Sequence, residues 1–324
     1  MKVTKKNYFT YLILFLLFFL FSPKHTYAEI GLSIEPAIIR VQVKPGKAIT
    51  KIFTVENRSS SDKILIARLI PFNKSDLNGN PNIDVKATSP HQRYFSLSNT
   101  NIKLNEPFTL KSQTKEQIVL SLSIPENANV EDFYTTLLVS TYDNVLPGTN
   151  AGTTIGASIG ANLLITITPD LNPKTILKVN NFKITSQNYL QLGQLIFVDS
   201  LSPITFQASV YNEGNHITET KGTVTITKKQ ETLSVQGLLP QYVLSKNSRQ
   251  LLNQNGSHIF IFKPNLLSFG RHQINIHVKS DSTNTQNSQD LIVVPIKIAL
   301  GLLLLFFLLK FILKKNPKIV DIDS

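Results

Sequence analysis

The chain has 324 residues and a formal net charge of +12, and it contains no cysteine. The absence of thiols excludes disulfides, thiolate zinc sites and a cysteine nucleophile, so packing and strand pairing must hold the fold together. Much of the positive charge lies at the two ends: residues 29–170 balance 13 basic against 13 acidic residues, and residues 171–290 hold 11 against 6. Because this small excess forms no basic cluster and the chain reads as an exported one, nucleic acid is not expected as a partner.

Residues 1–28 have the three parts of a secretory signal peptide. Lysines precede the apolar run YLILFLLFFLF, and a short polar stretch then ends at Ala28. The apolar run is too short to cross a hydrocarbon core, which needs about 20 residues. We therefore expect cleavage after Ala28 and an extracytoplasmic mature chain that begins at Glu29.

Residues 29–170 are predicted to form a first immunoglobulin-like β-sandwich. Apolar and polar residues alternate in Ile39–Lys44, the pattern of a strand with one face in water, and Pro45-Gly46 then turns the chain. The run Ile64–Ile70 is apolar on both faces apart from Arg68, as expected of a central strand covered by a second sheet. No helical period persists through the body, and turn-rich gaps recur about every 8–12 residues, which is the spacing of a sandwich. Further strands of this half are predicted at Asn101–Leu104, Phe108–Leu110, Ile118–Ile124, Phe133–Tyr142 and Asn162–Thr168.

One tyrosine has two possible roles. In the segment Pro125–Tyr134 a polar loop and an aspartate lead to a tyrosine at the start of an alternating strand. This arrangement is similar to the tyrosine corner of immunoglobulin-like sandwiches, where the phenol bonds back to the backbone. The alternative is an ordinary strand tyrosine.

A second immunoglobulin-like sandwich is predicted at residues 171–279. Pro169 and Pro173 bracket polar residues, a composition typical of a domain boundary. Strand-like alternation then resumes, for example from Ile204 to Val210. Residues 280–290 are low in apolar side chains and are predicted to be a flexible stalk.

The C-terminal part of the chain predicts a membrane anchor. Residues 291–313 read LIVVPIKIALGLLLLFFLLKFIL, long enough as a helix to span a core of about 30 Å, and the two lysines are expected to reach toward opposite interfaces. Lysines follow the span, so the short tail 314–324 is predicted to be cytoplasmic. We expect a single-pass protein of the cell membrane with an extracytoplasmic body.

No sequence motif predicts catalysis or metal binding. Gly156-Ala-Ser158-Ile-Gly160 matches a nucleophile elbow in letters, but a strand-like run follows it where that motif needs a helix. Asp76-Leu-Asn-Gly-Asn80 resembles part of a calcium loop, but its glycine precedes the third ligand and the acidic ligand expected at residue 87 is missing, so a tight turn is favoured.

The histidines do not predict a metal site or a catalytic site either. His272 and His277 are five residues apart on a predicted strand and therefore face opposite sides. His91, His216 and His258 have no partner at local spacing, although a constellation assembled by the fold would not be visible in the sequence. We expect no enzyme activity, no catalytic residues, no cofactor and no metal, and the ligand-binding residues are not predicted.

Several segments resemble the WxL-interacting-protein family of bacterial cell-surface proteins. In the first half these segments are FTVENRS, NKSDLNGNPNI and SIPENANVEDFYTTLLVS. In the second half they are VYNEGNHITETKGTVTI, VLSKNSR and SFGRHQINIHV, ahead of the apolar segment and its lysines. The resemblance implies two immunoglobulin-like domains and a membrane anchor, with the first domain contacting peptidoglycan and the second contacting other proteins or a host surface.

Two functions remain open at this point. The first is an adhesive or scaffolding protein of the cell surface that contacts cell-wall polymer (peptidoglycan) or surface proteins. The second is a docking subunit of a surface or secretion complex with no wall ligand of its own.

Overall fold

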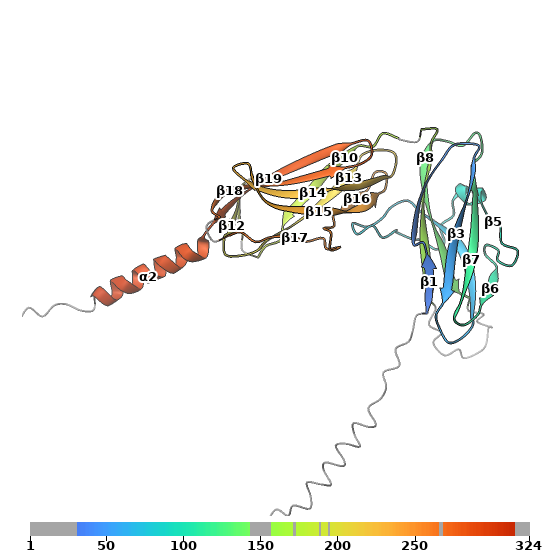
Figure 1. The fold of residues 1–324 in the computed structure, drawn as a ribbon, viewed down its shortest axis with the longest axis horizontal. Coiled ribbons are helices and arrows are strands. Elements are labelled where there is room, and N and C mark those ends of the chain that lie inside the picture. Colours follow the sequence, from blue (N-terminus) through green and yellow to red (C-terminus); the bar gives the residue numbers. More distant parts are fainter. Residues whose placement is uncertain are drawn as a thin grey trace, which may run out of the picture.

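The computed structural model describes residues 31–142, 157–170, 173–187, 189–193, 195–265 and 268–314. The predicted signal peptide and nearly all of the predicted tail lie outside these residues. The described body consists of β-strands and one short 3₁₀-helix, and a single α-helix follows it. The all-β class is therefore confirmed (Figure 1).

The first sandwich packs a four-stranded sheet against a five-stranded one. The four-stranded sheet has the order β1 (Leu32–Glu35), β3 (Ala48–Asn57), β7 (Thr114–Ser123) and β5 (Phe95–Leu97). The five-stranded sheet has the order β2 (Ile38–Val43), β9 (Ser158–Ile167), β8 (Glu131–Thr141), β4 (Lys63–Phe72) and β6 (Pro107–Leu110). In chain order the first sheet corresponds to strands A, B, E and D of an immunoglobulin-like domain, and β9, β8 and β4 correspond to G, F and C.

Alternation explains the faces of these strands. In β3 the side chains of Phe53 and Val55 point into the core, and their neighbours are exposed or half-buried. From Leu65 to Ile70 strand β4 is buried on both sides except at Arg68, in agreement with its position inside the five-stranded sheet. The predicted strand at Asn101–Leu104 is wrong: Leu104 makes only an isolated bridge with Ala67.

The second sandwich has its own core, in which Phe206 stacks on Phe182 and Phe260. Its smaller sheet has the order β10 (Leu177–Ile184), β13 (Ile204–Asn212) and β16 (Ser248–Gln250), with β17 (Phe260–Phe262) also paired to β13. Its larger sheet has the order β11 (Tyr189–Leu192), β12 (Leu195–Asp199), β19 (Asn284–Val294), β18 (Gly270–Lys279), β14 (Thr218–Lys228) and β15 (Glu231–Val243).

The predicted stalk at 280–290 is wrong. Residues 280–283 form a turn, and β19 then pairs with β18 over ten residues from Asn284 to Val293. The segment can be a strand although it is poor in apolar residues, because strand pairing uses backbone groups. One face of β19 is exposed along its polar half.

Helix α2 (Ile296–Lys314) follows β19 after Pro295. Residues 291–294, predicted to begin the membrane helix, belong instead to β19. Within the described part of the chain, no helix combines the length and the apolarity needed to cross a membrane.

The two sandwiches share one turn design that the sequence segments VENRS and VYNEG encode. Asn57 ends β3 and Asn212 ends β13, and both side chains are fully buried. In each case the side-chain oxygen accepts a hydrogen bond from the backbone N–H two residues later, of Ser59 or Gly214. The amide group donates to two or more backbone carbonyls, so one side chain satisfies several buried polar groups.

We predict that Asn212→Ala destabilises the second sandwich. The substitution leaves the Gly214 N–H and the carbonyls of His216 and Val243 without their partner, and each buried unsatisfied group costs about 1–3 kcal/mol. Urea unfolding measures the decrease in the free energy of unfolding. Asn255→Ala, in an exposed turn, is the control and should change stability by less than about 0.5 kcal/mol.

Candidate functional site

The two sandwiches meet at a corner with a hydrophobic centre. Phe72, Tyr134 and Leu164 of the first sandwich pack against Ile217 and Leu244 of the second. The rings of Phe72 and Tyr134 stack with their centroids 5.7 Å apart. Both domains therefore bury apolar surface in this contact, which favours one fixed arrangement over a swivelling linker.

A buried carboxylate crosses the same corner. Asp132, at the start of β8, has a side chain only 3% exposed, and one of its oxygens lies 2.9 Å from Nδ1 of His216. Its other oxygen accepts hydrogen bonds from the backbone N–H of Ile217 and from the hydroxyl of Tyr134. Because two of these three donors belong to the second domain, a change of interdomain angle would leave the buried carboxylate with fewer partners.

Tyr134 is not the tyrosine corner that the segment before it resembles. Its hydroxyl donates to Asp132 and accepts from the backbone N–H of Ser245, which belongs to the second sandwich. Burial and the neighbouring Asp132 carboxylate raise the pKa of Tyr134 well above its usual range. The phenol thus stays protonated and joins the two domains.

The segment Asp76–Asn80 also reaches the second sandwich. The carboxylate of Asp76 accepts hydrogen bonds from the backbone and the side chain of Asn80, which closes a turn. Gly79 has φ of +86° and presses on Arg249, so that a Cβ there would lie 2.3 Å from the guanidinium carbon. The adjacent Leu77 carbonyl accepts from the Gln250 N–H at 2.8 Å. The structure gives this motif a docking role between the domains.

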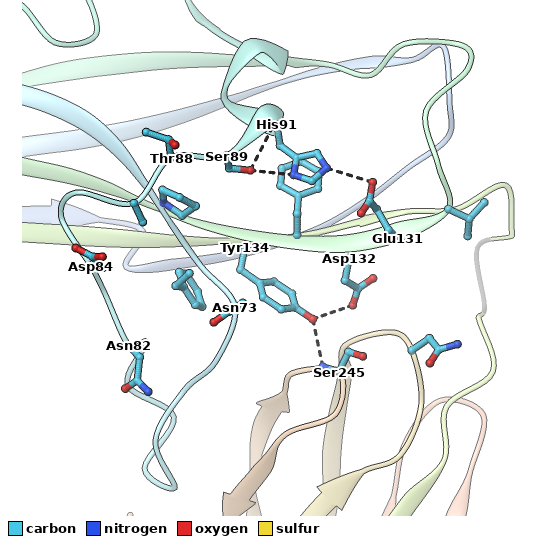
Figure 2. Close-up of a pocket in the computed structure, with 16 residues that line it drawn as sticks. Asn73, Asn82, Asp84, Thr88, Ser89, His91, Glu131, Asp132, Tyr134 and Ser245 are labelled. Carbon is cyan, nitrogen blue, oxygen red and sulfur yellow. Dashed lines mark hydrogen bonds and ion pairs between the residues drawn. The ribbon is translucent and has the colours of Figure 1, made fainter.

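A pocket of about 800 Å³ opens beside this corner (Figure 2). Its wall combines the ends of β4 and β8, the loop between β4 and η1 (Pro90–Tyr94), and two residues of the second sandwich, Asn215 and Ser245. Hydroxyl, amide and carboxylate groups line it, including three acidic side chains: Asp84, Glu131 and Asp132. No lysine or arginine is among the lining residues that the structure describes.

The fold assembles a serine, a histidine and a glutamate at the wall of this pocket. The Ser89 hydroxyl lies 3.0 Å from Nδ1 of His91, and Nε2 of that ring lies 3.2 Å from Glu131. Figure 2 shows the three side chains in line. The Ser89 hydroxyl also accepts from the His91 N–H as the N-cap of η1, and the imidazole stacks on Phe133 at 4.3 Å. These contacts orient the imidazole edge and the Glu131 carboxylate at the pocket wall.

The other motifs stay apart from the pocket. Ser158 opens β9, and Gly156 lies outside the described residues. In β18 the side chain of His272 is buried in the core and that of His277 lies on the opposite face, as predicted from their spacing. His258 lies in the second sandwich and is not among the residues that line the pocket. Among the described residues no group of three or more acidic or histidine side chains could hold a metal ion.

The sequence reasoning missed Glu131, Asp132 and Ser245. Glu131 and His91 are 40 residues apart, and Asp132 and His216 are 84 apart. In the sequence, the site is marked only by an aspartate that stands two residues before a tyrosine at the start of a strand. We interpreted this pattern as a feature of a single domain.

No protein-family model and no curated protein matches the sequence. Solved structures are similar in part. A chain of the CsuC–CsuE chaperone–tip adhesion subunit complex of Acinetobacter baumannii has 13% identity and a TM-score of 0.36, covering 81% of this chain and 99% of its own. The Escherichia coli chaperone DraB has 12% identity and a TM-score of 0.34, with 80% and 96% covered. A PapD-like domain of human CEP192 has 14% identity and a TM-score of 0.29, with 45% and 92% covered. At these scores we infer no ligand or partner from them.

We predict that Asp132→Ala releases the two sandwiches from their fixed angle. Since the chain has no native cysteine, spin labels can be placed at Ile52→Cys in β3 and Val235→Cys in β15, both exposed. Pulsed electron paramagnetic resonance should give a narrow distribution of label-to-label distances in the parent protein. In Asp132→Ala the distribution should be broad. Glu131→Ala, which removes a neighbouring carboxylate that bonds only within the first sandwich, should keep the narrow distribution.

We also predict that stability falls between pH 7 and pH 5 partly through His272. Burial lowers the pKa of His272, whose nitrogens contact Ser268 and the Gly270 carbonyl. Below the ordinary pKa of about 6.5 the unfolded chain gains a proton that the folded chain excludes, so acid favours unfolding. Urea unfolding at pH 7 and at pH 5 should show that the free energy of unfolding falls less in His272→Gln than in the parent. An equal loss would contradict the prediction, and His277→Gln controls for removal of an imidazole from the same strand.

Proposed function

We propose that this chain is a binding scaffold of the cell surface, and that the interdomain pocket holds its ligand. The observation that carries the proposal is the pocket itself: it lies at a corner fixed by Asp132, and both sandwiches contribute to its wall. A site shared by two domains needs a fixed interdomain geometry, and the buried contacts supply it.

The lining groups suggest the chemistry of the ligand. Acidic side chains in a wall whose described lining residues include no lysine or arginine disfavour anionic polymers and favour neutral or cationic ligands. The amides of Asn73, Asn82 and Asn215 and the hydroxyl of Thr88 can bond to sugars and to peptide groups. We therefore propose the glycan and peptide portion of cell-wall peptidoglycan as the ligand.

A binding role accounts for the Ser89–His91–Glu131 constellation better than catalysis does. The Ser89 hydroxyl is held as a helix cap by two contacts to His91, a residue only two positions away. In this geometry it orders the pocket wall and presents the imidazole edge to a ligand.

Attachment to the cell surface is the second part of the proposal. Its support is the signal-like segment 1–28 and helix α2, whose side chains from Ala299 to Ile312 are all exposed and are apolar except for Lys310. A helix that is apolar all round is stable only in an apolar environment, and we propose that α2 lies in lipid. The orientation with a cytoplasmic C-terminus stays a prediction.

The test is sedimentation of the purified chain in detergent with insoluble cell walls from which anionic polymers have been removed. We predict that Asn82→Lys lowers retention, because the added ammonium fills the pocket and competes for its carboxylates. The matched control Asn255→Lys, in an exposed turn of the second sandwich, should be retained like the parent.

Retention should survive added salt, because hydrogen bonds rather than exposed ion pairs hold a neutral ligand. Equal retention of parent and Asn82→Lys would contradict the pocket as the site. Failure of the parent to sediment would contradict wall binding and favour a docking subunit of a surface or secretion complex.

A further inference from the structure

Polar contacts hold the start of helix α2 to the second sandwich, and we call this set of contacts the lock. Asp199, at the end of β12, is only 2% exposed, and one oxygen accepts a hydrogen bond from the backbone N–H of Lys297 in the first turn of α2. Its other oxygen lies 3.4 Å from the Lys297 ammonium and accepts from the Ser202 hydroxyl. Lys297, expected from the sequence to reach toward a membrane interface, therefore bonds to the body.

The charge state of Asp199 agrees with this role. Burial by itself would raise the pKa of Asp199, but the hydrogen bonds from Lys297 and Ser202 and the Lys297 charge together lower it. The carboxylate is thus ionised at neutral pH and caps the N-terminus of α2, where negative charge is favourable. The first turn of the helix, which we call its root, is therefore held against the second sandwich.

Four large exposed side chains, Tyr189, Leu190, Leu201 and Phe269, belong to segments that begin or end near this root. The strand register places Tyr189 opposite Val198 and, through β12, level with Val293 at the end of β19. Phe269 immediately precedes Gly270, which is the register partner of Val293. The exposed fractions of Tyr189, Leu190, Leu201 and Phe269 lie between 42% and 62%. We call these four residues the end face.

One lysine contacts the end face, and two more follow nearby strands. Lys228 lies over the ring of Phe269, with its ammonium 5.5 Å from the ring centroid, and Lys229 follows it in the turn between β14 and β15. Lys263 immediately follows β17. Glu231 begins β15 just after the same turn, so cations outnumber this acid three to one among these positions.

Scattered apolar side chains are normal on a protein surface, but these four belong to segments that begin or end close to the start of an apolar helix. A protein partner would cover one side of α2, whereas its exposed side chains lie on every side. We propose that the end face rests on an anionic phospholipid bilayer, with Tyr189, Leu190, Leu201 and Phe269 in the interface and the lysines at the headgroups. This inference rests on the proposed lipid contact of α2.

The chain contains no tryptophan, so one introduced tryptophan reports its own surroundings. Leu190→Trp in β11 probes the end face, and Val235→Trp in β15 is the control. Both positions lie in edge strands of the same sheet and are similarly exposed, at 55% and 60%. Val235 pairs with Thr225, which is level with Asn275 rather than with the strand ends. Phe306→Trp in α2 is the lipid control.

Each full-length variant would be reconstituted in phosphatidylglycerol vesicles that contain brominated lipids. Leu190→Trp should emit at shorter wavelength than Val235→Trp and be quenched most by bromines near the headgroups, since interfacial residues enter about 5–10 Å. Phe306→Trp should be quenched most by deep bromines. Adding Asp199→Ala should reduce quenching at position 190 and leave position 306 unchanged, because the lock holds the end face at the bilayer.

The outcomes separate the two proposals. If Phe306→Trp is quenched but Leu190→Trp is quenched no more than Val235→Trp, the end face does not touch lipid and the inference is overturned while the lipid contact of α2 stands. If Phe306→Trp is not quenched, the lipid contact of α2 is overturned, and the inference with it. Lys228→Glu together with Lys229→Glu should weaken quenching at position 190 in phosphatidylglycerol but not in phosphatidylcholine vesicles.

Discussion

The buried carboxylate of Asp132 is the contact on which the arrangement of the molecule depends. It receives donors from Tyr134 in its own domain and from His216 and Ile217 in the other. A buried charge tolerates little movement of its partners, because losing one donor leaves the charge poorly solvated. The angle between the sandwiches (Figure 1) follows from this requirement, and with it the shape of the pocket to which both contribute (Figure 2).

The turn that presents these donors is itself fixed from within the second sandwich. Asn212 bonds to the carbonyl of His216 and thereby holds the backbone that carries His216 and Ile217 toward Asp132. Asn57 makes the same turn in the first sandwich, where its hydrogen bonds among the described residues stay within that domain. One local design thus serves stability in one domain and interdomain contact in the other.

Alternation and turn residues predicted the sandwiches, because both depend on neighbours in the sequence. Phe53 and Val55 in β3 are an example: their faces follow from the two-residue period alone. The stalk was mispredicted because β19 is specified by its pairing with β18, a long-range contact that polar residues such as Asn284 do not reveal. The pocket was missed for the same reason, since His91 and Glu131 come together only in three dimensions.

Because residues 284–290 belong to β19 rather than to a flexible stalk, mechanical load on the body would pass through this strand. The second sandwich begins at β10, next to the first sandwich, and ends at the far end of β19, where α2 is locked by Asp199. A pull between a surface-bound first sandwich and a held helix would act along the strands. Ladder hydrogen bonds run across the strands, so those joining β19 to β18 would be loaded in shear together and not opened one at a time. Under such a pull the second sandwich would bear tension along its strands.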